Sequence, residues 1–136
     1  MKGHAASLVV VLLALAACGG DDEAVPAPRT ELTISVWPEG RQAGEPRTWT
    51  LSCDPPSGSH PSPEEACRRL ATLDDAFAPV PPDTICTAIY GGPGVAVVSG
   101  EHAGDRVDAS FDRINGCEID RWERHAFLFP VKPGSA

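Results

Sequence analysis

Five cysteines constrain this chain more than any other feature, because cross-links between them restrict which parts can lie together. They stand at positions 18, 53, 67, 86 and 117. Disulfides are the usual state of cysteine in an exported chain, and the amino end here has the pattern of an export signal. Three pairings of the last four are possible, and proximity along the chain favours Cys53–Cys67 with Cys86–Cys117. A metal site is disfavoured, because the chain has no CxxC pair and its histidines are scattered.

The odd number of cysteines is explained if Cys18 carries a lipid. Lys2 precedes an apolar run, Ala5 to Ala17, that is too short for a permanent membrane span and suits a signal peptide. The run ends in Leu15-Ala16-Ala17-Cys18, which resembles a bacterial lipobox, where the cysteine thiol carries a diacylglycerol. An ordinary secretory signal with an unrelated cysteine is the alternative. We therefore expect an exported protein, lipid-anchored through Cys18 at the outer face of the bacterial cell membrane, or secreted.

Composition divides the chain into four parts. Residues 1–17 are the expected lipoprotein signal peptide. Residues 18–31 are rich in glycine, proline, alanine and acidic residues, have almost nothing to bury, and predict a lipid-anchored flexible linker. Residues 32–130 are expected to form one domain, followed by a tail at 131–136. The formal net charge of −8 opposes nucleic-acid binding, which needs a basic surface, and we expect no cofactor.

The hydrophobic pattern of the domain predicts an α+β fold. Apolar residues alternate with polar ones at 32–37 and at 47–53. These two stretches indicate an antiparallel pair of strands, with Trp49 in the core. A helix is expected to begin at Pro63, with Ser62 as its N-cap and Glu65 closing a capping box. Ser99 to Asp105 predicts a hairpin turn. The expected strands are 32–37, 47–53, 94–98, 106–114 and 122–129. We therefore expect about five antiparallel strands in one sheet, with one or two helices.

One segment, Ile85 to Tyr90, has a composition that does not suit an ordinary surface loop. It lies between Pro79-Val80-Pro81-Pro82 and Gly91-Gly92-Pro93, and prolines predict extended backbone that cannot continue a helix or a central strand. Yet it contains an isoleucine, a cysteine and a tyrosine, which a solvent-exposed loop has little reason to display. An extended segment that a disulfide holds, with its side chains outward, has the shape of a protease substrate.

The same segment resembles a known family. Cys86-Thr87-Ala88-Ile89-Tyr90, with Cys117 downstream, is similar to the reactive-site loop of the Streptomyces subtilisin inhibitor (SSI-like) family of serine protease inhibitors. Ser57-Gly58-Ser59-His60-Pro61 resembles the family's first disulfide loop, and Phe127-Leu128-Phe129 resembles its closing strand. The resemblance covers about Leu32 to Phe129. It implies disulfides Cys53–Cys67, which pins the helix to the sheet, and Cys86–Cys117, which holds the reactive loop.

The resemblance implies an inhibitor that binds like a substrate, not an enzyme. It places the scissile bond between Ala88 and Ile89, with Ala88 in the specificity pocket of a subtilisin-like or elastase-like secreted serine endopeptidase. Thr87 would enter the pocket before it and Tyr90 the second pocket after it, with Cys86 also in contact. Asn115 would brace the loop through its side-chain amide, although Asn115-Gly116 is also a common tight-turn pair. A homodimer is a further implied property.

One departure from the family pattern leaves a second function open. The family commonly has Tyr-x-Pro after the scissile bond, whereas Tyr90-Gly91-Gly92-Pro93 is one residue longer, and two glycines would soften the leaving side. A cell-surface lipoprotein domain that kept the scaffold and lost inhibition is therefore the alternative function. An enzyme is disfavoured, because Ser99, His102 and Asp105 are close in sequence but lie in an expected polar turn.

Overall fold

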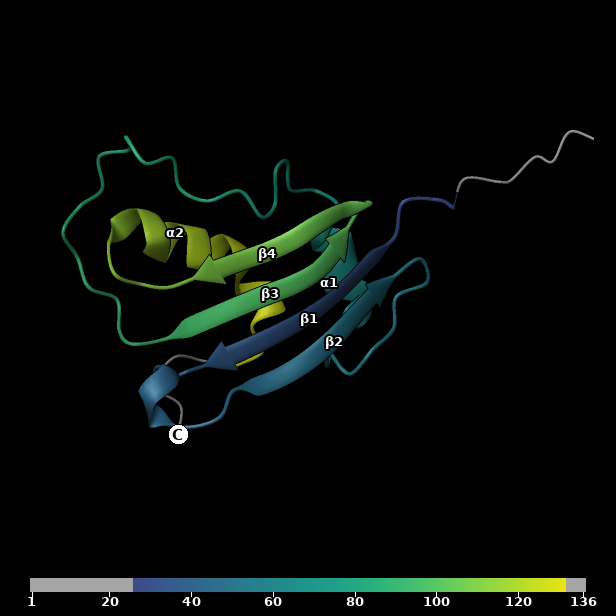
Figure 1. The fold of residues 1–136 in the computed structure, drawn as a ribbon, viewed down its shortest axis with the longest axis horizontal. Helices are drawn as coiled ribbons and strands as arrows, with labels where there is room; N and C mark the ends of the chain where they lie inside the picture. Colours follow the sequence, from purple (N-terminus) through teal and green to yellow (C-terminus); the bar gives the residue numbers. More distant parts are fainter. Residues whose placement is uncertain (1–25, 132–136) are drawn as a thin grey trace, which may run out of the picture.

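A computed structural model describes residues 26–131 of the chain. One four-stranded antiparallel sheet has the order β2-β1-β3-β4, and both α-helices pack against the same face of it (Figure 1). The strands are β1 Thr30–Trp37, β2 Arg47–Cys53, β3 Val95–His102 and β4 Asp105–Phe111. The helices are α1 Pro63–Leu70 and α2 Gly116–His125, with short 3-10 helices η1 Arg41–Ala43 and η2 Ala126–Leu128. The predicted α+β class is confirmed.

Alternation of apolar and polar residues explains the central strand. Leu32, Ile34 and Val36 of β1 are buried, and the residues between them lie on the opposite face of the sheet. Ile34 pairs with Trp49 of β2 on one side and with Val98 of β3 on the other. A shift of one residue would expose every buried side chain of β1, so this pattern specifies the register.

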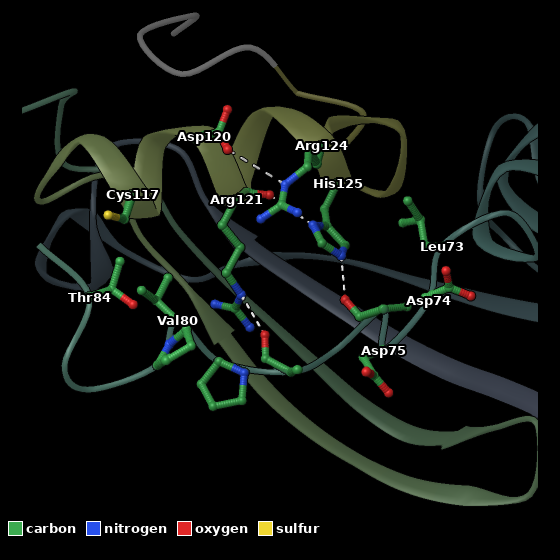
Figure 2. Close-up of a pocket in the computed structure, with 14 residues that line it drawn as sticks. Leu73, Asp74, Asp75, Val80, Thr84, Cys117, Asp120, Arg121, Arg124 and His125 are labelled. Carbon is green, nitrogen blue, oxygen red and sulfur yellow. Dashed lines mark hydrogen bonds and ion pairs between the residues drawn. The ribbon is translucent and has the colours of Figure 1, made fainter. Parts of the chain in front are cut away.

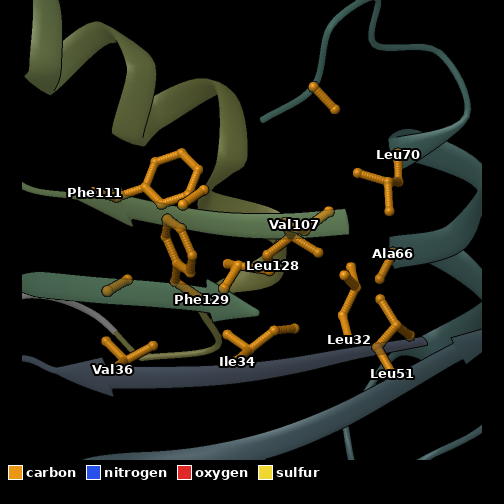
Figure 3. Close-up of a cluster of buried hydrophobic side chains, with 14 of the residues drawn as sticks. Leu32, Ile34, Val36, Leu51, Ala66, Leu70, Val107, Phe111, Leu128 and Phe129 are labelled. Carbon is orange, nitrogen blue, oxygen red and sulfur yellow. The ribbon is translucent and has the colours of Figure 1, made fainter. Parts of the chain in front are cut away.

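The core lies between the sheet and the helices (Figure 3). Its largest fully buried side chains include Trp122 of α2 and Phe111 of β4, and Leu128 of η2 fills the space between the helices and the sheet. Trp49 was expected in the core, but it is half-buried and packs against the margin of the cluster. The edge position of β2 explains this, because nothing in the described part of the chain lies beyond that strand in the sheet.

The helix expected from Pro63 is confirmed, with Pro63 in its first turn. Ser62 occupies the N-cap position but makes no side-chain capping hydrogen bond. Instead, its main-chain N–H donates to His60 Nδ1 at 3.1 Å. The strand β1 begins at Thr30, two residues before the expected domain boundary. Within residues 26–131, no helix has the length and apolar character that crossing a bilayer requires.

The strand expected at residues 122–129 is wrong. This stretch contains the end of α2 and the whole of η2, so the sheet has four strands. The reason is the cap: Asn115 Oδ1 accepts a hydrogen bond from Glu118 N–H at 3.0 Å and starts a helix that runs through Trp122. The expected turn at 99–105 is also too long, since β3 and β4 continue to His102 and from Asp105.

Candidate functional site

The longest connection of the described chain joins α1 to β3 and contains the segment Ile85 to Tyr90. It leaves the end of α1, crosses beside α2 and returns to the start of β3, outside the sheet (Figure 1). Residues 85–91 form no helix or strand. The prediction that this segment continues neither a helix nor a strand is therefore confirmed.

Apolar side chains of this segment point into solvent. Ile85 is 98% exposed, Ile89 57% and Tyr90 68%, and Thr87 and Ala88 are exposed as well. Exposed apolar residues grouped on one loop indicate a surface that a partner covers. Ile85, the first residue of the segment, was given no separate role from the sequence, and it lies three residues before Ala88 on the same exposed loop.

Both predicted disulfides are present. Cys86 in the loop is bonded to Cys117 in the first turn of α2, with their Cα atoms 5.3 Å apart. Cys53 at the end of β2 is bonded to Cys67 of α1, with a Cα separation of 5.7 Å. The expected staple two residues before Ala88 therefore exists. Cys18, the expected lipidation site, lies outside the described residues.

Thr87 is the point where hydrogen bonds hold the approach to the Ala88–Ile89 bond. Its carbonyl oxygen accepts from Gly116 N–H at 3.0 Å and from Ile89 N–H at 2.9 Å. Glycine at position 116 leaves room for Thr87, because a Cβ there would overlap Thr87 Oγ1 and force the Thr87 side chain to move. The Asn115 side chain caps α2 through its oxygen, so main-chain N–H of the next residue supplies the support seen at Thr87. A direct brace from the Asn115 amide stays a prediction.

Gly91 is a second anchor, on the other side of the bond. Gly91 N–H donates to Arg113 O at 2.7 Å, and Arg113 Nε donates to Gly91 O at 2.8 Å. Arg113 also pairs with Glu123 Oε1 at 2.8 Å. The sequence offers no local signal for Arg113, because its contact with Gly91 spans 22 residues. The leaving side is thus tied to the body, although its two glycines predicted a soft segment.

A strap formed by residues 74–81 carries the chain towards the loop and lies over α2 (Figure 2). Arg121 is buried and donates from Nε to Ala78 O at 3.0 Å and from Nη1 to Ser110 O at 2.7 Å. His125 contacts Arg121 O at 2.8 Å and the carbonyl of Ala76. Burial lowers the pKa of His125, so the ring is held neutral more readily than in water. A cavity of about 430 Å³ remains between strap and helix.

Ser99, His102 and Asp105, which were considered as catalytic residues, are not arranged as a triad. Ser99 and His102 lie on opposite faces of β3, because their separation is odd. His102 Nδ1 instead lies 3.1 Å from Thr30 Oγ1, and burial lowers the pKa of His102 despite the neighbouring Asp105. No group of three potential metal ligands occurs within residues 26–131.

Comparisons with known proteins agree with this geometry. The chain matches the family described as subtilisin inhibitor-like over residues 13–114. It is 34% identical over 101 residues to subtilisin inhibitor-like protein 5 of Streptomyces fradiae, covering 72% of this chain and 94% of that protein.

Two further relatives are similarly distant. Subtilisin inhibitor of Streptomyces albogriseolus is 34% identical over 122 residues, covering 85% of this chain and 83% of that protein. A transglutaminase-activating metalloprotease inhibitor of Streptomyces mobaraensis is 32% identical over 102 residues, covering 72% and 68% respectively. With its exposed, disulfide-bonded loop, this chain therefore belongs to the subtilisin inhibitor-like family of protease inhibitors, and not to a family of enzymes.

Proposed function

We propose that the protein inhibits subtilisin-like or elastase-like serine endopeptidases by presenting Ala88–Ile89 as a substrate bond. One observation carries the proposal: an exposed dipeptide is held on both sides. Cys86 and Thr87 tie the preceding residues to α2, and Gly91 ties the following residues to the segment before α2.

The held conformation is the source of affinity. Serine proteases bind a peptide as an extended strand, and a flexible peptide loses roughly 1–2 kcal/mol of backbone entropy for each residue that it orders. A loop ordered before binding avoids this cost. Over five or six residues, the difference amounts to several kcal/mol, or several powers of ten in the dissociation constant.

The same order makes cleavage reversible. The enzyme's serine oxygen attacks the carbonyl carbon of Ala88, the bond to Ile89 N breaks, and that nitrogen leaves as an amine with the proton from the serine. In the reverse step, the amine attacks the acyl ester, the peptide bond forms again and the serine oxygen regains its proton. Because both ends stay attached to the body, the amine remains at a high effective concentration.

Side chains around the bond set the class of protease. Ala88 is small and uncharged, so it suits the small or apolar pockets of elastase-like and subtilisin-like enzymes and offers no cation to a trypsin-like pocket. Thr87 and Tyr90 would occupy the neighbouring pockets before and after it. Ile85 extends the contact on the earlier side, where its exposed side chain would gain apolar burial on binding.

Asn115 has an indirect part in this proposal. By capping α2, its oxygen fixes the first turn of the helix, which contains Gly116 and Cys117. Both of these residues hold the loop, through Thr87 and Cys86 respectively. The cap therefore supports the reactive bond indirectly, and a direct bond from the Asn115 amide to a loop carbonyl stays a further prediction.

The direct test is a titration of protease activity with purified protein. We expect stoichiometric loss of subtilisin activity, similar loss for an elastase, and little or none for trypsin. A metalloprotease belongs in the same panel, because one relative is named for inhibiting that class. If subtilisin and elastase both keep full activity at excess protein, the non-inhibitory binding or structural domain is the correct alternative.

Location and assembly complete the proposal. We propose that Cys18 is lipidated, which mass spectrometry of the amino-terminal peptide from a membrane fraction would show as a diacylglycerol adduct.

For a homodimer, the face of the sheet opposite the helices is the available surface, with Ser35 and Thr48 hydrogen-bonded across it at 3.1 Å. Light scattering of the purified protein measures whether the dimer forms.

A further inference from the structure

The leaving side of the reactive bond contains a clamp that glycine composition alone would not suggest. We use the name Gly91 clamp for Gly91, Arg113 and Glu123. Gly91 N–H donates to the main-chain oxygen of Arg113 at 2.7 Å and Gly91 O accepts from the Arg113 side chain at 2.8 Å, so neither peptide group that flanks Gly91 can turn without breaking a contact. Gly91 lies only two residues after Ile89, which would become the free amine.

Glycine at position 91 is what allows the close approach. A Cβ there would lie 2.7 Å from Ile119 Cγ1 and 3.1 Å from Arg113 Cβ, so any other residue would push the loop away from α2. Glycine at position 91 therefore has two consequences. It removes a side chain, and it permits main-chain contacts that a larger residue would prevent.

Arg113 is itself held in place. Its side chain is 15% exposed, its Nη1 contacts Glu123 Oε1 at 2.8 Å, and its guanidinium lies 5.7 Å from the centre of the Trp122 ring. A guanidinium has donors in a fixed plane, so pairing one of them with Glu123 orients Nε towards Gly91. Glu123 is 60% exposed and acts at the outer end of this arrangement.

We propose that Arg113 is a positioning residue for the inhibitory reaction, resting on the function proposed above. After the Ala88–Ile89 bond is cut, the clamp keeps Gly91 in place, and the amine of Ile89 stays within reach of the acyl ester. Loss of the clamp lets the new amino terminus move away, water then hydrolyses the ester, and the protein becomes a slowly consumed substrate.

The test compares wild type with Arg113→Ala. Each protein is incubated with a catalytic amount of subtilisin, starting once from intact and once from cut protein, and mass spectrometry measures the ratio of cut to intact chain at equilibrium. We expect the variant to raise this ratio, and the rate of net cutting, by about tenfold, as loss of one hydrogen bond from a charged donor implies. Arg113→Lys is expected to fall between the two, because an ammonium group lacks the second directed donor.

A matched control is Arg124→Ala in α2. Arg124 pairs with Asp120 at 3.7 Å, and both side chains are largely exposed. This variant should leave the ratio at the wild-type value. If Arg113 has only a structural role, Arg113→Ala will lower the melting temperature. The ratio of cut to intact chain will then stay unchanged at temperatures where the protein is folded, and that result would overturn the proposal.

A second measurement needs no protease. Hydrogen exchange of the Gly91 amide reports the clamp directly, because this N–H donates to Arg113 O. Arg113→Ala keeps this main-chain acceptor but removes the Nε bond to Gly91 O, so the segment should open more often. We expect the Gly91 amide to exchange about tenfold faster, while exchange in β1 is unchanged. Unchanged exchange at Gly91 overturns the inference even if the protein inhibits well. If exchange does speed up but the wild type inhibits no serine protease, the proposed function fails and the positioning role falls with it.

Discussion

The two disulfide-bonded regions contain the same kind of cross-link, but the cross-link has a different role in each. Cys53–Cys67 closes a separation of 14 residues and Cys86–Cys117 one of 31. Chain entropy alone gives both bonds a similar stabilisation of about 3 to 4 kcal/mol. Stability therefore does not distinguish them, and the difference lies in what each bond holds.

The first region is tied to the sheet by its own main chain. Ser52 and Ser57 exchange two main-chain hydrogen bonds, at 2.9 and 2.8 Å, and His60 N–H donates to Thr50 O at 3.0 Å. His60 is buried beneath this loop. In the described part of the chain, the second region is held at its two ends, around Thr87 and Gly91, and the side chains between them are exposed. A loop whose main chain is held in one conformation while its side chains stay exposed can be both rigid and accessible to a partner.

Removing the second disulfide should have the largest effect on inhibition. In Cys86→Ser/Cys117→Ser, the loop loses its covalent tie beside Thr87, and each freed residue costs roughly 1–2 kcal/mol to order on binding. We expect the inhibition constant for subtilisin to rise by about a hundredfold to a thousandfold, with faster cleavage of Ala88–Ile89. Both are measured at a temperature where the variant is folded.

The matched variant is Cys53→Ser/Cys67→Ser. It should lower the free energy of unfolding by about 3 kcal/mol, measured by denaturant titration, and leave the inhibition constant nearly unchanged. If it weakens inhibition as much as loss of Cys86–Cys117 does, while still folded, the two regions are not independent and the comparison fails.

A charge at the reactive bond should change the target and not the fold. Ala88→Lys places an ammonium group where a trypsin-like enzyme has an acidic pocket, and a hydrogen-bonded ion pair there is worth about 1.5–3 kcal/mol. We expect trypsin inhibition to improve by about tenfold to a hundredfold, measured as an inhibition constant.

Ser57→Lys is the matched control for Ala88→Lys. Its side chain is exposed in the first disulfide loop, so the same charge is added far from the reactive bond. Trypsin inhibition should stay at the wild-type value. An unchanged profile for Ala88→Lys would falsify the assignment of Ala88 to the specificity pocket.

One glycine in each region separates stability from inhibition at smaller magnitude. Gly58 has φ +112° and a Cβ there would meet the Thr50 carbonyl, so Gly58→Ala should lower the free energy of unfolding by about 1–3 kcal/mol. Gly116→Ala should instead displace Thr87 and weaken inhibition about tenfold, with a smaller change in unfolding. Paired thermal melts and inhibition assays measure both, and a reversed pattern would contradict the division of roles.

Much of this architecture could be predicted because the relevant signals are local. Alternation along β1 and β2 predicted their pairing, and Pro63 marked the start of α1. Proximity in sequence favoured the observed disulfides. The prolines and glycines around Ile85–Tyr90 predicted an exposed segment outside any helix or strand.

The carboxyl-terminal helix could not be predicted from hydrophobic pattern because its buried face is mainly polar. Arg121, Trp122 and His125 lie on that face, although arginine is usually exposed and histidine is buried less often than the apolar residues. Their burial is compensated by carbonyls of the strap and of β4, which are distant in sequence. The spacing of Asn115 and Glu118 was the one available signal, since it fits a helix N-terminus.

The contacts that order the loop depend on the tertiary fold. Arg113 meets Gly91 only because α2 packs against β4 and brings the segment before α2 beneath the returning chain. Nothing about an arginine between Asp112 and Ile114 indicates this. The sequence therefore predicted which side chains the loop exposes, while the structure was needed to show which contacts hold the loop in place.

The pH dependence should be the smallest difference between the two regions. Burial lowers the pKa of His60 in the first disulfide loop, and of His102 and His125, below the ordinary value of 6.5. As pH falls through 6.5, the unfolded chain takes up protons that the folded protein does not, so the free energy of unfolding decreases. Denaturant titrations between neutral and mildly acidic pH measure this loss.

The reactive loop should respond differently to the same change. No histidine lies between Cys86 and Pro93, and the anchors at Thr87 and Gly91 are made by main-chain groups and an arginine, which stay in the same protonation state over this range. His60→Asn should therefore reduce the acid loss of stability while leaving the pH profile of inhibition unchanged. If inhibition weakened in parallel with stability while the protein was still fully folded, order in the loop would depend on the buried histidines, and the separation between the two regions would have to be abandoned.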